Sequence, residues 1–348
     1  MNTQLQKELV VELPEGFTAR GANMNDVEPA LALFNRWSRS VIGRDEITDA
    51  QAIRNEWVSP GFDPAADILL VFAPNGQMAG YTEVWTIGKP PVHPWMWGRV
   101  DPDYEDLGIG TWMMHWAEQR ALQALNDVPA ELRFAPRVGT YHESVKPKKL
   151  FEDMGYHHIR SSYHMLIEMD APVPEPVWTE GITLRTFSPE IDAEAVYRAE
   201  DESFRDHFGY VEQPFEEGFK RFKHFVLEAK DFDPTLLFLA MDGPSGEIAG
   251  INICRLHSYD DPDMGWVGTL GVRRQWRKRG IGLALLRHSF NEFYRRGKRK
   301  VGLGVDAQNL TGALRLYESA GMHVHQALDQ YEKELRLGTE ISVQSLSE

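Results

Sequence analysis

The sequence predicts an α/β (α+β) protein of two tandem domains, each a mostly antiparallel mixed sheet flanked by helices. The chain has 348 residues, enough for two cores of about 150 residues each. The predicted order of strands and helices occurs twice. Between the copies lies DAPVPEPVWTEG, whose prolines disfavour regular structure. We therefore expect a first domain over residues 1–170, a linker over 171–180, a second domain over 181–336 and a tail over 337–348.

Each copy is predicted to begin with an alternating strand, followed by a helix and a hairpin. The strand is GFTAR in the first copy and GITLR in the second, and the helix is DVEPALALFNRW or EIDAEAVYRAEDESF. The hairpins ADILLVFAPNGQMAGYTEVWTI and PTLLFLAMDGPSGEIAGINICRLH have turns marked by glycine and polar residues. This repeated order indicates a duplicated unit.

The next strand of each copy ends in a glycine turn, EDLGIG in the first copy and RKRGIG in the second. A helix with one apolar face is predicted after each turn, and its apolar residues are Ile109, Met113 and Trp116, or Leu286, Phe290 and Phe293. After a further strand, each copy has a short helix that ends at Gly155 or Gly321, which we predict as C-caps.

Composition excludes several classes of protein. Apolar residues make up 42% of the chain and charged residues 26%, as in soluble globular proteins. We expect a cytoplasmic protein without a membrane partner, because no apolar run reaches about 18 residues and no signal peptide is recognisable. The net charge of -15 disfavours nucleic acid. The single cysteine, Cys254, excludes an internal disulfide and is predicted to be a buried apolar residue rather than a nucleophile.

The turn RKRGIG has the chemistry of a diphosphate site. A helix that begins near Gly280 leaves backbone N–H groups without internal partners, and these groups attract anions together with the helix dipole. Gly280 and Gly282 permit close approach to the backbone, and Arg277 and Arg279 can add charge-assisted hydrogen bonds. The glycines alone do not identify the ligand, because the patterns of a nucleoside triphosphate loop and of a dinucleotide fold are both missing.

The wider pattern resembles the acetyl-CoA-binding core of the GCN5-related N-acetyltransferase (GNAT) superfamily. Two stretches carry the resemblance, TLGVRRQWRKRGIGLALL and GVDAQNLTGALRLYESAGM. The first matches the family pattern at Val272, Arg277, Gly280, Gly282 and Leu285, and the second at Asn309, Ala313, Tyr317 and Gly321. The whole layout is similar to tandem, two-domain members of the superfamily, such as the mycothiol synthases.

The resemblance implies two tandem GNAT domains with acetyl-CoA as co-substrate. The backbone of Leu270, Gly271 and Val272 would pair with the pantetheine amides and polarise the thioester carbonyl. The diphosphate would be held by Arg277, Lys278, Arg279, Gly280, Ile281 and Gly282, and the pantetheine arm by Asn309. Tyr317 would stand beside the thioester sulfur as general acid. Without this context, Tyr317 would be interpreted as a core residue of an amphipathic helix.

The general base stays open at this point. Many members of the superfamily place a glutamate on the strand before the glycine turn, and WVGTLGV offers none. Four residues are alternatives: Glu202, His207, Asp263 and Asp306. We expect acceptor contacts from DESFRDHFGYVEQPF, whose acids and aromatic rings suit a cationic amine, although a solvated amphipathic helix has the same composition.

The first copy lacks the chemistry of the second. Alignment of Val100 with Val272 puts Glu105, Asp106 and Leu107 at the positions of Arg277, Lys278 and Arg279. Carboxylates repel a diphosphate, by roughly 1 kcal/mol for each unit-charge contact at about 4 Å even in water. Phe151 lies at the position of Tyr317, so the hydroxyl is missing as well. We therefore expect the first copy to be retained for packing.

These features predict an N-acetyltransferase that moves an acetyl group to a small-molecule primary amine in a ternary complex, with its active site in the C-terminal domain. Two alternatives are a transferase that uses another acyl-CoA and a non-catalytic acyl-CoA sensor or assembly module. We expect no metal, because no acid or cysteine set completes the histidine groups His157, His158 and His164, or His323 and His325. The acceptor and the choice between monomer and homodimer stay open.

Overall fold

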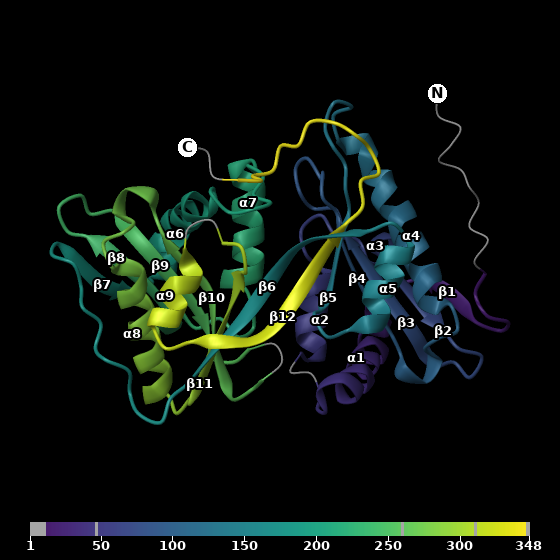
Figure 1. Cartoon of the computed structure of the whole chain (residues 1–348), viewed down its shortest axis with the longest axis horizontal. Helices are drawn as coiled ribbons and strands as arrows, with labels where there is room; N and C mark the ends of the chain where they lie inside the picture. Colours follow the sequence, from purple (N-terminus) through teal and green to yellow (C-terminus); the bar gives the residue numbers. More distant parts are fainter. Residues whose placement is uncertain (1–11, 46–47, 259–260, 310–311, 346–348) are drawn as a thin grey trace. The chain divides into compact units, whose positions relative to one another are not determined.

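The chain forms two compact units, each assembled from separate segments of the sequence (Figure 1). The computed structural model describes residues 12–45, 48–258, 261–309 and 312–345. Unit 1 comprises Met1–Thr140, Ser144–His158 and Tyr331–Thr339, and unit 2 comprises Tyr141–Glu143, Ile159–Gln330 and Glu340–Glu348. No helix among these described ranges is both long and apolar enough to cross a membrane.

Unit 1 contains the first copy of the repeat. Its strands are β1 (Thr18–Gly21), β2 (Ile68–Phe72), β3 (Met78–Trp85), β4 (Trp95–Val100) and β5 (Arg137–Tyr141), which are neighbours in that order. Only the β4–β5 pair is parallel among these neighbours. The helices are α1 (Val27–Ile42), α2 (Ala50–Trp57), α3 (Pro64–Asp67), α4 (Ile109–Gln123) and α5 (Val145–Asp153).

Unit 2 contains the second copy. Its strands are β6 (His157–Glu168), β7 (Ile182–Thr186), β8 (Leu237–Asp242), β9 (Ile248–Arg255), β10 (Met264–Val272), β11 (Lys300–Asp306) and β12 (His323–Glu332). Their order is β12-β6-β11-β10-β9-β8-β7, and β10 pairs with β11 in parallel. The helices are α6 (Pro189–Phe204), α7 (Phe215–Phe222), α8 (Ile281–Arg295) and α9 (Ala313–Ser319). The predicted fold class, mostly antiparallel sheets flanked by helices, is confirmed.

The strands at the ends of the two copies depart from the domain bounds expected from sequence. β6 precedes the proline-rich stretch, yet it pairs antiparallel with β11, with Leu166 opposite Gly302. Conversely, the chain after Gln330 returns to unit 1, where Leu335 N donates to Phe134 O at 3.0 Å. A strand edge accepts any segment that satisfies its backbone groups, so chain order does not dictate the partner. Residues 171–180 themselves contain no helix or strand.

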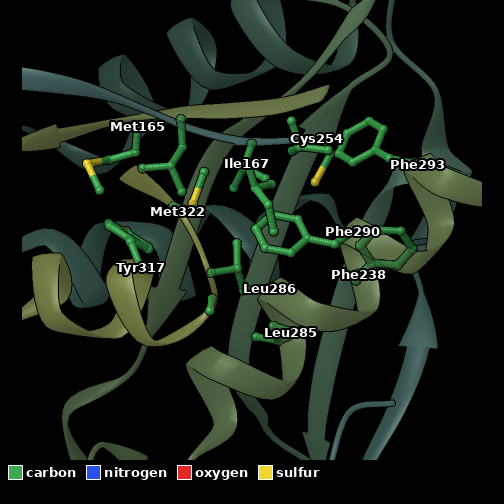
Figure 2. Packing of buried hydrophobic residues seen from close by; sticks show 14 of the residues in the cluster. Met165, Ile167, Phe238, Cys254, Leu285, Leu286, Phe290, Phe293, Tyr317 and Met322 are labelled. Atoms are coloured by element: carbon green, nitrogen blue, oxygen red, sulfur yellow. The ribbon is translucent and has the colours of Figure 1, made fainter. Parts of the chain in front are cut away.

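The core of unit 2 lies on both faces of its sheet. On β8, Phe238 and Ala240 join a buried cluster with α8, whereas Leu237 and Leu239 face α6 and α7. This alternation follows from the two-residue period of a strand. Figure 2 shows the α8 side, where Phe290 and Phe293 pack with strand residues. Cys254 lies among them, and burial raises the pKa of its thiol, so the prediction of a buried apolar cysteine is confirmed.

An ion pair is duplicated in the two copies. Arg20 binds Asp26 at 2.6 Å in unit 1, and Arg185 binds Asp192 at 2.5 Å in unit 2. Each pair links the first strand of its copy to the start of the first long helix. The burial of α1 and α6 matches when Asp26 is aligned with Asp192, which fixes the correspondence between the two helices.

Candidate active site

The two glycine turns have the same backbone conformation. Lys278 and Asp106 both have a φ of 61°, in the left-handed region that non-glycine residues rarely adopt. Gly280 and Gly108, the N-caps of α8 and α4, have φ angles of 79° and 82°. One backbone design therefore occurs twice, and the chemical differences between the turns lie in their side chains.

The turn before α8 presents unpaired backbone N–H groups. The first helical hydrogen bond runs from Ala284 N to Gly280 O at 3.1 Å. Within the described parts of the chain, no acceptor meets the N–H groups of residues 278–283. A Cβ added at Gly280 would meet nothing within 4 Å, whereas one at Gly282 would lie 3.1 Å from Leu316 Cδ1. Gly280 thus leaves open space for an anion, and Gly282 allows α9 to approach α8.

Arg277 is engaged by the protein in this structure. Its guanidinium donates to Asp206 Oδ2 at 2.5 Å, to Ser203 O at 3.0 Å and to Val272 O at 3.1 Å. Although partial burial opposes it, hydrogen bonds from Arg277 and Arg274 hold the pKa of Asp206 below its ordinary value. Arg277 therefore links the end of β10 to the end of α6, a contact that the expected diphosphate role does not include.

The other members of the predicted diphosphate site take different positions. Lys278 and Arg279 are exposed, and Ile281 is buried beneath the turn. The hydroxyl of Thr179 donates to the carbonyl of Arg279, so the proline-rich stretch contacts the turn. The exposed cations at 278 and 279 lie next to the free N–H groups, where they can add charge for an anion.

The parallel strands β10 and β11 separate beside this turn. Their pairing runs from Met264 opposite Lys300 to Val267 opposite Leu303. The register against β9 shifts between Val267 and Thr269, which marks a bulge at Gly268. Beyond the bulge, no described residue of β11 pairs with residues 270–272. The β11-facing edge of Leu270, Gly271 and Val272 is therefore open to pair with an extended ligand.

Tyr317 and Asn309 lie at the two ends of one short segment. Tyr317 is on α9 and packs beside Met165 and Met322 (Figure 2). Burial raises the pKa of Tyr317 to about 12, and no described residue hydrogen-bonds its hydroxyl. Asn309 Oδ1 accepts a hydrogen bond from Ala313 N at 3.1 Å, so the amide caps the start of α9.

Of the four expected candidates for the general base, two are ion-paired, one is exposed and one, His207, is partly buried. Glu202 is paired with Arg273 at 2.7 Å, and Asp306 with Arg160 at 2.6 Å. Burial lowers the pKa of His207, and Asp263 is exposed at the start of β10. The carboxylates of Glu202 and Asp306 are each already occupied by a guanidinium group.

Glu200, on α6, is a residue that no sequence pattern singles out. Glu200 Oε1 accepts a hydrogen bond from Thr269 Oγ1, next to the bulge of β10, at 3.0 Å. Burial raises the pKa of Glu200 to about 7, and the Thr269 hydrogen bond opposes this change. α6 lies close against β10, since a Cβ on Gly271 would be 2.9 Å from Ser203 Cβ. In the sequence Glu200 resembles any polar residue of an amphipathic helix, because its contact with Thr269 joins positions 69 residues apart.

The segment expected to contact the acceptor is held by the tail of the chain. Gly209 N donates to Val343 O at 2.8 Å, and Val343 N donates to Tyr210 O at 2.9 Å. The Tyr210 hydroxyl donates in turn to Asp201 Oδ1 at 2.8 Å. Residues 340–345 therefore hold the loop after α6 through Val343.

In the corresponding turn of unit 1, a lysine of the same unit binds the two acidic side chains. Lys146 Nζ donates to Glu105 Oε2 at 2.7 Å and to Asp106 Oδ2 at 2.8 Å. Lys146 precedes Phe151 by five residues, as Gly312 precedes Tyr317. An ammonium group thus lies beside the acidic turn of unit 1, whereas unit 2 has a glycine at the matching position. Among the described residues, no group of three or more histidine, cysteine or acidic side chains is arranged to hold a metal.

Comparisons with known proteins agree with the repeat and with the fold. The Acetyltransferase (GNAT) family matches residues 193–322. A mycothiol acetyltransferase of Salinispora arenicola is 30% identical over 319 residues, which cover 86% of this chain and 96% of the relative. The crystal structure of a GCN5-related N-acetyltransferase from Sphaerobacter thermophilus is 34% identical, with a TM-score of 0.77 over 96% of this chain and 100% of that one.

A tandem GNAT protein from the clavulanic acid biosynthesis pathway has the same fold at 17% identity, with a TM-score of 0.68 over 93% of this chain and 100% of that one. Members of this fold family use an acyl-CoA as co-substrate. The relatives cover both copies of the repeat, and the family match lies on the second. The chain therefore belongs to the GNAT superfamily, as a tandem N-acetyltransferase.

Proposed function

We propose that this chain transfers an acetyl group from acetyl-CoA to a primary amine by direct attack in a ternary complex, at a single site in unit 2. One observation carries the proposal: two turns of equal backbone geometry differ in charge. The turn of unit 2 has exposed cations beside free N–H groups, and that of unit 1 has Glu105 and Asp106 bound to Lys146. Acetyl-CoA supplies an electrophilic carbonyl carbon and a thiol leaving group.

Three parts of unit 2 would hold the co-substrate. The N–H groups of residues 278–283, with Lys278 and Arg279, suit the diphosphate. The open edge of Leu270–Val272 suits the pantetheine amides, which can pair with it as an added strand. Asn309 would orient the start of α9 and contact the pantetheine arm. Arg277 would act by holding β10 against α6 rather than by touching phosphate.

Binding of acetyl-CoA tests the proposal directly. Isothermal titration calorimetry of the full chain is expected to give one site per chain. A panel of amines then tests transfer, followed as release of CoA: a diamine, an aminoglycoside, an amino-acid amide, a peptide with a free N-terminus and the deacetylated, free-amine form of mycothiol, the compound for which the Salinispora relative is named. Two binding sites would contradict the account of unit 1, and binding without acetylation of any amine would contradict the transferase.

Tyr317 would hydrogen-bond the leaving sulfur. Full proton transfer is unfavourable, because the phenol has a pKa of about 12 and a thiol has a pKa of about 8.5. A hydrogen bond to a charged group contributes about 1.5–3 kcal/mol. Tyr317→Phe is therefore expected to lower kcat about tenfold or more, with the Kd for acetyl-CoA unchanged.

Steady-state kinetics and calorimetry check this expectation. Tyr294→Phe is the matched control, since its hydroxyl donates to Asp170 O at the surface of unit 2. It should leave kcat unchanged. Full turnover by Tyr317→Phe would remove this residue from the mechanism.

A further inference from the structure

We propose that Glu200 is the general base that takes the proton from the acceptor nitrogen, with Thr269 as its positioning residue. The inference rests on the proposed function of the same site. Glu200 Oε1 lies 3.0 Å from Thr269 Oγ1, and Thr269 immediately precedes the open edge of β10 at Leu270. A base beside this edge is within reach of an amine that approaches the acyl group held there.

The carboxylate of Glu200 is not committed to a cation. Its hydrogen bond comes from a neutral hydroxyl, and no cation among the described residues forms an ion pair with it. By contrast, Glu202, Asp206 and Asp306 are each paired with arginine. Burial without a cation disfavours the ionised form, which keeps the pKa of Glu200 at about 7, where a general base works best.

Few charges surround Glu200 to alter its titration. On its own helix, the nearby groups are Asp201, which raises the pKa of Glu200, and Tyr197. α6 packs against β9, β10 and α7. On these elements β10 has no charged residue, β9 has Arg255, which pairs with Asp231, and α7 has Glu216, Glu217, Lys220 and Arg221.

The first copy supplies an internal comparison. Alignment of the paired strands makes Trp97 the equivalent of Thr269, because Val100 lies opposite Gly80 as Val272 lies opposite Gly250. The alignment of Asp26 with Asp192, from the duplicated ion pair, makes Phe34 the equivalent of Glu200. Phe34 and Trp97 form an edge-to-face ring pair with centroids 5.4 Å apart.

Apolar rings therefore occupy the position of the acid and hydroxyl in the copy that lacks the cationic turn and the tyrosine. In unit 1 the equivalent helix and strand are joined here by the two rings, with the Arg99 guanidinium over both of them, so no carboxyl group is needed to hold this helix against the sheet. Its presence in unit 2 coincides with the other features of the proposed site.

The chemical step balances as follows. The neutral amine nitrogen attacks the acyl carbonyl carbon, a C–N bond forms, and Glu200 takes a proton from nitrogen. The C–S bond breaks and its electron pair goes to sulfur, which gains a proton from solvent. Glu200 then returns its proton to solvent. The products are an amide and a thiol, and no oxidant or reductant is required.

Two variants show whether Glu200 acts as a base or only supports the structure. Glu200→Gln keeps an oxygen that can accept from Thr269 but cannot take a proton. With the best amine of the panel, we expect kcat/KM of Glu200→Gln to fall about 100-fold or more. The wild-type pH–rate profile should show an acidic limb, a fall of kcat/KM below about pH 7, and this limb should be missing in the variant. Thr269→Val keeps the carboxylate and removes the hydrogen bond that lowers its pKa, so the limb should move to higher pH with at least a tenth of the activity retained.

The same experiment distinguishes failure of this inference from failure of the proposed function. Acetyl-CoA binding and thermal melting are measured for all three proteins, and both variants should match the wild type. If the wild type acetylates an amine and Glu200→Gln does so within threefold, or with the acidic limb retained, Glu200 is not the base. If the wild type binds acetyl-CoA and acetylates no amine, the proposed function fails and the inference fails with it.

Discussion

Gly280→Val is expected to weaken acetyl-CoA binding about 10- to 100-fold, and Gly108→Val is expected to leave it unchanged. Both glycines cap a helix at a φ near 80°, and a Cβ added at either position would meet no atom within 4 Å. A side chain there costs about 1–2 kcal/mol in backbone strain at either position. Only at Gly280 would it also block N–H groups proposed to bind a diphosphate, each charge-assisted bond contributing about 1.5–3 kcal/mol.

Calorimetry with acetyl-CoA and thermal melting of both variants check this pair. Both variants are expected to lose the same thermal stability, because the backbone strain is the same at the two glycines. Only Gly280→Val is expected to lose affinity for acetyl-CoA, because only the turn of unit 2 is proposed to bind it. An equal loss of affinity in two variants whose thermal melts show them to be folded would mean that the turn of unit 1 also binds the co-substrate. That result would contradict a single site in unit 2.

The sequence was sufficient for features encoded by neighbouring residues. The turns and the helices after them are local patterns and have the expected backbone. Gly155 and Gly321, predicted as C-caps, lie one residue beyond the C-caps Met154 and Ala320, in the left-handed conformation that ends a helix, with φ angles of 83° and 96°. Comparison of the two copies also identified the acidic turn of unit 1. Its cation, Lys146, lies some forty residues beyond Glu105 and Asp106, and nothing in the local pattern indicates that pairing.

Features that depend on distant residues were beyond sequence analysis. The ion pair of Arg277 with Asp206 joins positions 71 apart, and no local pattern indicates it. Glu200 becomes distinctive only when α6 is seen against Thr269, 69 residues later. The partners of β6 and of residues 331–339 were hidden for a similar reason, because the segments with which they pair lie more than a hundred residues away in the sequence.

Glu332 lies in the segment 331–339 that returns to unit 1. Glu332→Gln is expected to destabilise unit 1 by about 3–5 kcal/mol, the usual cost of removing one partner of a buried ion pair. Its carboxylate accepts from Arg133 at 2.5 Å and from Arg137 Nε at 2.8 Å, and its side chain is 7% exposed. Glu334→Gln is the matched control, because Glu334 also binds Arg133 but is 37% exposed. Exposed pairs contribute about 0–1 kcal/mol.

The Glu332 network also predicts how the stability of unit 1 depends on pH. Burial opposes ionisation, but hydrogen bonds from Arg133 and Arg137 prevail and hold the pKa of Glu332 below its ordinary 4.5. A depressed folded-state pKa stabilises the fold above pH 4.5, and this contribution is lost as pH falls through the folded value. Urea unfolding and hydrogen exchange at residues 331–339 should therefore show the acid sensitivity in wild type and Glu334→Gln, and less of it in Glu332→Gln. Equal acid sensitivity and equal stability in all three would mean that the returning chain segment is held in unit 1 by its backbone pairing with residues 132–136, without help from the buried charges.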